Sequence, residues 1–68
     1  MKKIVVYRDS EGKLWEEFKY GNAIGKYIQE IDAYDKIIFP HNFREISDND
    51  LKQMSKEVIW KENNQDQI

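Results

Sequence analysis

Residues 3–20 constrain the fold of this chain more than any other stretch, because they predict a β-hairpin with apolar side chains on both faces. The two arms of the hairpin are rich in β-branched and aromatic residues, as strands are. Between the arms, Asp9 can accept hydrogen bonds from the backbone that follows it, and Gly12 can adopt a positive φ. We therefore predict a three-residue loop over residues 10–12, which places Tyr7 opposite Trp15.

Alternation along the two strands divides their side chains between two faces. The face that we expect to cover the core carries Ile4, Val6, Leu14, Glu16, Phe18 and Tyr20. The other face carries Lys3, Val5, Tyr7, Trp15, Glu17 and Lys19. This second face has an aromatic pair among charged side chains, and a shift of one residue in register would exchange the two faces.

The middle of the chain predicts a helix and a short strand. Asn22 is a good helix N-cap, and the four isoleucine and tyrosine residues that follow have the spacing of one helical face. We therefore expect a helix over residues 23–33. Residues 37–39 are an apolar run that Pro40 ends, which is typical of a short central strand.

The C-terminal part of the chain predicts a second helix, whose end is open to two interpretations. After a loop over residues 41–46, Ser47 is suited to cap a helix that begins at Asp48. We expect this helix to extend to about Lys61. The alternative is that residues 56–62 form a strand, because they include three consecutive strand-forming residues.

These elements predict an α+β fold of order ββαβα, with a three-stranded, mostly antiparallel sheet and both helices on one face. A ββαβ fold with a fourth, C-terminal strand is the alternative. Residues 1–62 form a single domain in either fold, and residues 63–68 are a polar tail that we expect to be disordered. Because the helices cover one face only, the face centred on Tyr7 and Trp15 stays open.

Composition excludes several classes of function. The chain has 68 residues, no cysteine and one histidine, so it lacks disulfides and the residues of an ordinary zinc site. Eleven basic and thirteen acidic residues are interspersed and leave a net charge of −2, which argues against a nucleic-acid-binding tail. No apolar run is long enough for a signal peptide or a membrane span. We expect a cytoplasmic protein without a cofactor.

No motif predicts catalysis or a metal site. Glu16 and Glu17 are adjacent in a strand, so their carboxylates point to opposite faces and cannot act as an acid–base pair. Residues 48–50 begin like a calcium-binding loop, but the glycine and glutamate that such a loop needs further on are missing. His41 has no nucleophile at a spacing that specifies a triad. We predict that the protein is not an enzyme.

We therefore predict a small non-enzymatic protein-binding module, such as a bacterial or phage-encoded inhibitor or adaptor of a larger protein. Aromatic side chains are common hot spots of such interfaces. The predicted contact surface consists of Val5, Tyr7, Trp15, Glu17 and Lys19. One alternative is a homodimer that buries the same face. Another is a single-stranded nucleic-acid binder, in which bases stack on Tyr7 and Trp15 beside Lys3 and Lys19, although the acidic chain disfavours it.

Overall fold

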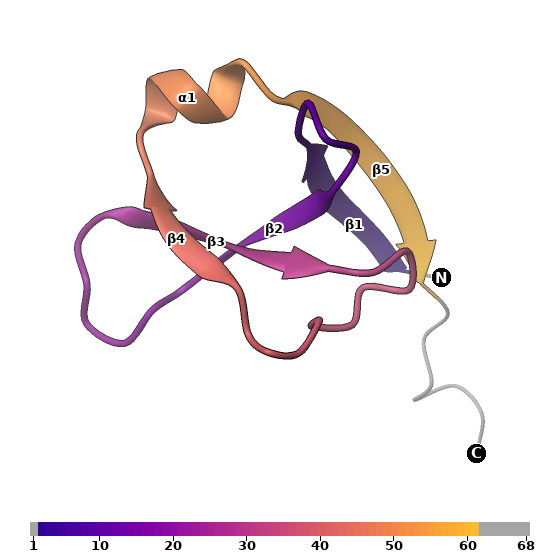
Figure 1. The fold of residues 1–68 in the computed structure, drawn as a ribbon, viewed down its shortest axis with the longest axis horizontal. Helices are drawn as coiled ribbons and strands as arrows, with labels where there is room; N and C mark the ends of the chain where they lie inside the picture. The colour runs from indigo at the N-terminus through magenta and orange to yellow at the C-terminus, as the bar shows by residue number, and fades with distance from the viewer. Residues whose placement is uncertain (1, 62–68) are drawn as a thin grey trace.

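The computed structural model describes residues 2–61, which form a five-stranded antiparallel sheet with one short helix (Figure 1). The elements are β1 (Lys2–Arg8), β2 (Leu14–Phe18), β3 (Lys26–Ile31), β4 (Phe43–Ile46), α1 (Asp48–Lys52) and β5 (Ser55–Lys61). The strand order is β4-β3-β2-β1-β5, so β5 returns to lie beside β1. The predicted three-stranded sheet with helices on one face is therefore wrong, and so is the four-stranded alternative.

The hairpin turn forms as predicted. Asp9 Oδ1 accepts hydrogen bonds of 2.9 Å from the backbone N–H groups two and four residues later. Gly12 adopts a φ of +83°, a conformation that only glycine adopts without strain. Tyr7 pairs with Trp15 in the expected register. Local hydrogen bonds within the turn therefore favour this part of the fold.

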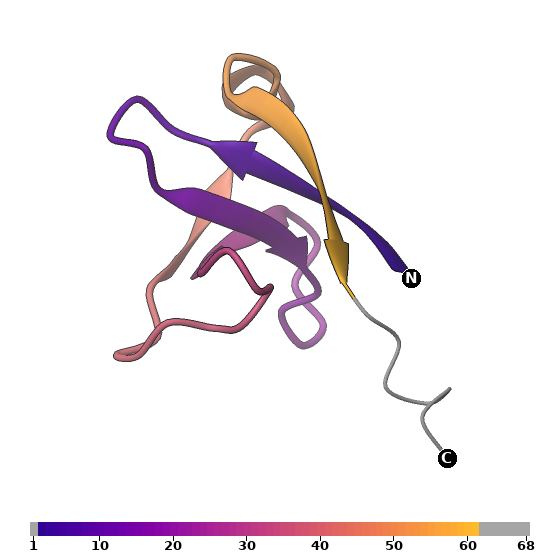
Figure 2. The same ribbon diagram turned by 90° about the vertical axis from the view of Figure 1, so that its right-hand side faces the viewer.

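The two strands of the hairpin separate with distance from the turn. Within the described residues they pair only at Tyr7–Trp15 and Arg8–Leu14, so the pairs predicted nearer the N-terminus do not form. Instead, β1 pairs with β5 over seven positions, whereas β2 pairs with β3. The sheet therefore curls, and β1 and β5 run at an angle to the half that contains β2, β3 and β4 (Figures 1 and 2).

Residues 26–31 form strand β3, and the helix predicted over residues 23–33 is wrong. Ile28 and Ile31 are both buried, and residues three apart in a strand point to opposite faces. Because both faces of β3 are covered, the apolar spacing imitates that of a helix. Ile24, expected on the buried side of that helix, is instead fully exposed in the loop before β3.

The segment between β3 and β4 is irregular, so the strand predicted over residues 37–39 is also wrong. Ile37 makes one isolated bridge to Ile31 and does not continue into a ladder. Residues 43–46, predicted as part of a loop, form the edge strand β4 and pair with β3. The apolar run thus touches β3 through this bridge and through a hydrogen bond of 3.2 Å from the N–H of Ile38 to the carbonyl of Glu30, but it forms no strand.

Ser47 caps α1 as predicted, and its hydroxyl accepts a hydrogen bond of 3.1 Å from the N–H of Asp50. The helix ends at Lys52, far short of its predicted end. Residues 55–61 extend along β1, which confirms the alternative interpretation of this segment as a strand. Backbone pairing with β1 at seven positions stabilises the extended conformation of this segment more than additional helical turns would. The predicted tail, residues 63–68, lies outside the described residues.

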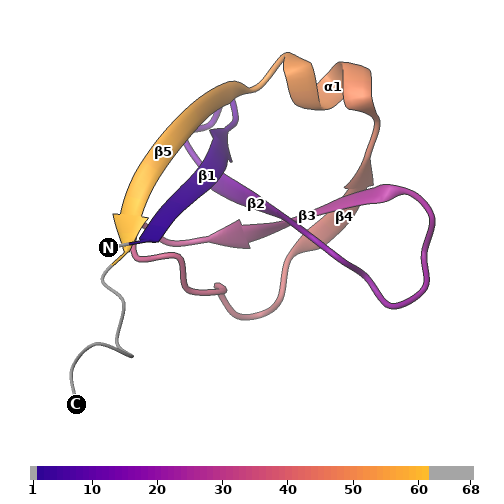
Figure 3. The same ribbon diagram turned by 180° about the vertical axis from the view of Figure 1, so that it is seen from behind.

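Both faces of the curled sheet hold part of the core. On the face predicted to be buried, the cluster consists of Ile4, Val6, Leu14 and Ile31, with the half-buried Ile59. On the face predicted to be open, it consists of Trp15, Ile28, Ile46 and Leu51, with Tyr7 and Met54 packed against them. The helix α1, which connects β4 to β5, supplies Leu51 to this second cluster (Figures 1 and 3). The prediction that this face stays open is therefore wrong.

The two tryptophans allow a matched test of this core. Trp15 is 5% exposed, whereas Trp60 is 63% exposed. We expect Trp15→Ala to cost about 3–5 kcal/mol of unfolding free energy, because it leaves a large cavity. Since a core of this size supplies roughly 3–5 kcal/mol in total, the variant should be largely unfolded. Trp60→Ala should change the unfolding free energy of the single chain by no more than about 0.5 kcal/mol.

Urea denaturation followed by far-UV circular dichroism measures both variants. Equal stability of the two alanine variants would show that Trp15 is not a core residue.

Candidate functional site

The structure disperses the five residues predicted to form the contact surface. Trp15 is buried in the core, so the prediction that its indole is exposed is wrong. Val5 is half-buried on β1, Glu17 is exposed on β2, and Lys19 lies beyond the end of β2. Tyr7 is half-buried and lines a pocket. Glu17 and Lys19 line a different pocket, so the structure does not bring them together with Tyr7.

Polar groups from two other elements hold the indole of Trp15 in place. Its Nε1–H donates a hydrogen bond of 2.9 Å to Oδ2 of Asp9, and the guanidinium carbon of Arg44 lies 5.2 Å from the ring centroid. The hydrogen bond from Trp15 lowers the pKa of the Asp9 carboxyl, and the backbone N–H groups of Lys13 and Glu11 lower it further. The Trp15 side chain therefore has a structural role, and its polar contacts with Asp9 and Arg44 orient it within the core.

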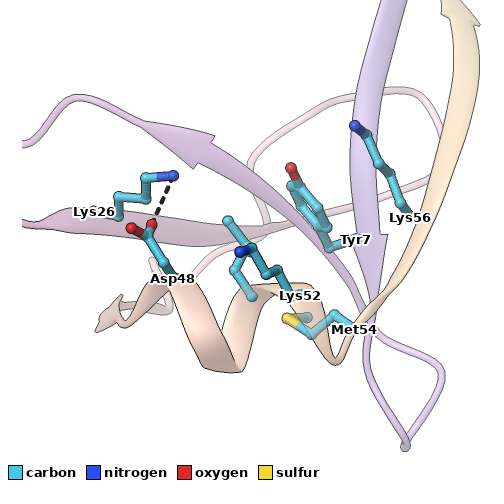
Figure 4. Close-up of a pocket in the computed structure, with 7 residues that line it drawn as sticks. Tyr7, Lys26, Asp48, Lys52, Met54 and Lys56 are labelled. Carbon is cyan, nitrogen blue, oxygen red and sulfur yellow. Dashed lines mark ion pairs between the residues drawn. The ribbon is translucent and has the colours of Figure 1, made fainter.

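A pocket of about 430 Å³ lies between α1 and the strands β1, β3 and β5 (Figure 4). We call it the lysine groove. It is lined by Tyr7, Lys26, Asp48, Leu51, Lys52, Met54 and Lys56. Leu51 and Met54 form an apolar floor that continues into the core cluster of Trp15. The groove therefore combines apolar surface with three amines.

Three elements position the charged groups of the groove. Tyr7 and Lys56 occupy paired positions on β1 and β5 and lie side by side (Figure 4). Asp48 and Lys52 are four residues apart in α1, so they project from the same side of the helix. Lys26, the first residue of β3, places its Nζ 2.8 Å from Oδ1 of Asp48. Hydrogen bonding within this pair raises the pKa of the Lys26 amine and lowers that of the Asp48 carboxyl.

The groove carries an excess of positive charge, because three of its lining residues are lysines and one is an aspartate. Asp48 pairs with Lys26, whereas Lys52 and Lys56 form no ion pair within residues 2–61. The whole chain has a net charge of −2, so the sign of the charge is reversed locally. A concave surface of this kind attracts anionic groups.

The chemistry of the groove suits binding. Its lining residues offer ammonium donors, one phenol and apolar surface, and none of them is a histidine, serine or cysteine. No cluster of histidine, cysteine, aspartate and glutamate side chains within residues 2–61 could hold a metal ion. His41 lies elsewhere, with its Nε2 3.0 Å from Oε1 of Gln29. The groove therefore lacks the serine–histidine and cysteine–histidine pairs of the common hydrolases.

A second group of rings lies on the face opposite the lysine groove. Its members are Phe18, Tyr20, Tyr27, His41 and Phe43. Their centroids are 4.8 to 6.3 Å apart, at separations typical of aromatic packing. Phe18, Tyr27 and Phe43 are half-buried, so the rings shield one another and this part of the sheet. We interpret this cluster as packing.

The sequence analysis missed the groove because it placed two of its lysines in helices. Lys26 was expected within a helix over residues 23–33 and Lys56 within a helix, yet both are in strands. One signal was present: a helix capped by Ser47 places Leu51 and Met54 three residues apart, as the start of an apolar face. That signal locates the floor of the groove but not its lysines.

Comparisons of the chain with protein-family models, curated proteins and solved structures found no match. Within the part of the chain that the structure describes, no helix has the length and apolar character needed to cross a bilayer.

The contact between Asp9 and Trp15 predicts a dependence of stability on pH. Because folding lowers the pKa of Asp9 below its ordinary value of 3.8, the contact stabilises the fold fully above that value. The stabilisation is lost as the pH falls through the lowered pKa. We expect the unfolding free energy to decline less steeply below pH 3.8 in Asp9→Asn than in the native chain.

Urea denaturation at a series of acidic pH values measures this difference. Trp15→Phe, which removes the N–H donor, should flatten the same part of the profile. Identical slopes in the native chain and in Asp9→Asn would contradict the role assigned to Asp9.

Proposed function

We propose that this chain is a small non-enzymatic protein-binding module, which uses the lysine groove to hold an acidic segment of a larger protein. The observation that supports this function is the arrangement of three lysines around an apolar floor. Carboxylates of the partner pair with Lys52 and Lys56, and one apolar side chain contacts Leu51 and Met54. An apolar centre within a charged rim is the usual anatomy of a protein interface.

An acidic protein segment fits the groove better than nucleic acid does. Binding of single strands relies on exposed aromatic platforms, and Trp15, the strongest candidate for stacking, is buried. Tyr7 is the one ring that lines the groove, and it is half-buried. The net charge of −2 also opposes long-range attraction of a polyanion. Electrostatic complementarity therefore acts over a few contacts, as it does in protein recognition.

In this proposal, the module acts in the cytoplasm as an inhibitor or adaptor of its partner. A surface that binds without reacting acts by occupying an acidic region of its partner. The absence of cysteine suits a reducing compartment.

Titration of the ¹⁵N-labelled chain tests this function directly. The probes are a peptide of alternating glutamate and leucine residues, a peptide of alternating lysine and leucine residues, and a single-stranded oligonucleotide. We expect the acidic peptide to shift the amide signals of Tyr7, Lys52, Met54 and Lys56, and the basic peptide to leave them unchanged. The proposal fails if the oligonucleotide shifts these signals and the acidic peptide does not, or if no probe shifts them.

Charge-removal variants test the role of the lysines. The double variant Lys52→Gln, Lys56→Gln should bind the acidic peptide about fivefold more weakly, because exposed pairs are worth roughly 0.2–1 kcal/mol each and ~1.4 kcal/mol is a factor of ten. Lys13→Gln, Lys36→Gln is the matched control, since it removes two exposed lysines outside the groove. Equal losses in the two double variants would show a nonspecific charge effect.

A substitution at Asp48 should have the opposite effect. Asp48 is the acidic residue among those that line the groove, and it pairs with Lys26. We expect Asp48→Asn to tighten binding of the acidic peptide, because it releases the amine of Lys26 and removes a repulsive charge. Fluorescence anisotropy of the labelled peptide measures the change. A weaker complex in this variant would argue against an anionic ligand.

A further inference from the structure

The two edges of the sheet differ in how they are protected. The edge strand β4 has four residues, and its Arg44 and Glu45 are exposed and charged. The other edge strand, β5, has seven residues and contains no proline. Proteins usually shorten, charge or interrupt an exposed edge, because its unpaired N–H and C=O groups can bind another strand. β4 follows this pattern in both length and charge. β5 carries the charged residues Lys56 and Glu57, but it is long and has no interruption.

β5 is regular along its length. All seven of its residues pair with β1 in a continuous antiparallel register, so its other side presents a regular row of backbone groups. Figure 2 shows β5 beside β1 at this edge of the sheet. Within residues 2–61, no strand pairs with that outer side. The edge is therefore shaped to accept a further antiparallel strand.

The side chains of β5 add an apolar surface to this edge. Val58 and Trp60 are 43% and 63% exposed, and both lie on one face of the strand because they are two residues apart. On β1, Val5 and Lys3 are their partners in the register and extend the same face. Large exposed apolar side chains at a long sheet edge are characteristic of a site of association.

We infer that β5 pairs antiparallel with β5 of a second copy of this chain, about a two-fold axis at Val58. In the register that uses all seven residues, Val58 faces its own copy, and Lys56 faces Trp60 of the partner subunit. Glu57 faces Ile59 of the partner subunit. No like charges face each other among these pairs, and an ammonium beside an indole is a favourable contact.

We favour a second copy of the chain as the partner of this edge, because β5 is complementary to itself when it is paired antiparallel about Val58. An isologous contact requires a surface that is complementary to itself, and the sequence of β5 meets this condition about its central residue. The axis is perpendicular to the sheet, so the paired sheets continue through the contact and keep corresponding faces on the same side. The inference shares Lys56 with the lysine groove, but it does not depend on what that groove binds.

The oligomeric state of the native chain tests the inference. We expect light scattering coupled to size exclusion to give a mass that approaches twice that of one chain as the protein concentration rises. A mass that stays at one chain at millimolar concentration would overturn the inference.

A cysteine at the axis tests the register. Residues directly opposite each other in an antiparallel pair have Cα atoms about 4.5–5.5 Å apart, within the range of about 4.4–6.8 Å that a disulfide spans. The chain has no cysteine, so Val58→Cys introduces a unique thiol. On mild oxidation this variant should form a disulfide-linked dimer at least tenfold faster than Ile24→Cys. Ile24 is fully exposed in a loop and is the matched control.

Equal cross-linking of the two variants would overturn the register. Val58→Lys places two ammonium groups opposite each other and should shift the native dimer to monomer, with Ile24→Lys as its control. Because Val58 is partly exposed, circular dichroism should show that both lysine variants keep the fold. A dimer that survives Val58→Lys would also contradict the inference.

Discussion

The burial of Trp15 is the interaction on which the rest of this fold depends. Its indole joins the cluster of Ile28, Ile46 and Leu51, which come from β3, the end of β4 and α1. The hydrogen bond to Asp9 ties the same ring to the hairpin turn. One side chain thus links elements that are far apart in the sequence. In a chain this small, a single large side chain carries a substantial share of the buried apolar surface.

Burial of this ring requires the sheet to curl, and the curl creates the lysine groove. β1 leaves β2 after two pairs and follows β5, so the two halves of the sheet turn toward α1. Leu51 closes the inner side of the core, and the lysines project around the opening beside it. The groove is therefore a consequence of how the core is covered. Its charges are on the rim because amines keep their hydration there while their stems cover apolar surface.

Much of the local structure could be predicted from the residues themselves. The turn after Asp9, the pairing of Tyr7 with Trp15 and the cap at Ser47 were all correct, because each depends on hydrogen bonds among neighbouring residues. The helix predicted over residues 23–33 failed for an equally physical reason. A strand buried on both faces does not alternate, so its apolar spacing was mistaken for that of a helix.

The candidate site was predicted only in part. Tyr7 was predicted to belong to the contact surface, and it does line the groove. The prediction rested on the size of its aromatic ring and on its place in the hairpin. Trp15 was assigned to the surface because no predicted element packed against that face of the hairpin. In the structure, Ile28, Ile46 and Leu51 cover it. Lys52 and Lys56 line the same pocket from the two sides of the turn between α1 and β5, and the sequence alone did not decide where that helix ends.

By itself the amino-acid sequence determined the hairpin turn, the start of α1 and the absence of thiol chemistry. Only the tertiary structure decided that residues 26–31 and 55–61 are strands, that Trp15 is buried and that three lysines surround one groove. Turns and caps are stabilised by contacts a few residues apart, which are legible in the sequence. Strand pairing joins residues that are distant along the chain, and its free energy depends on which partners the whole fold makes available.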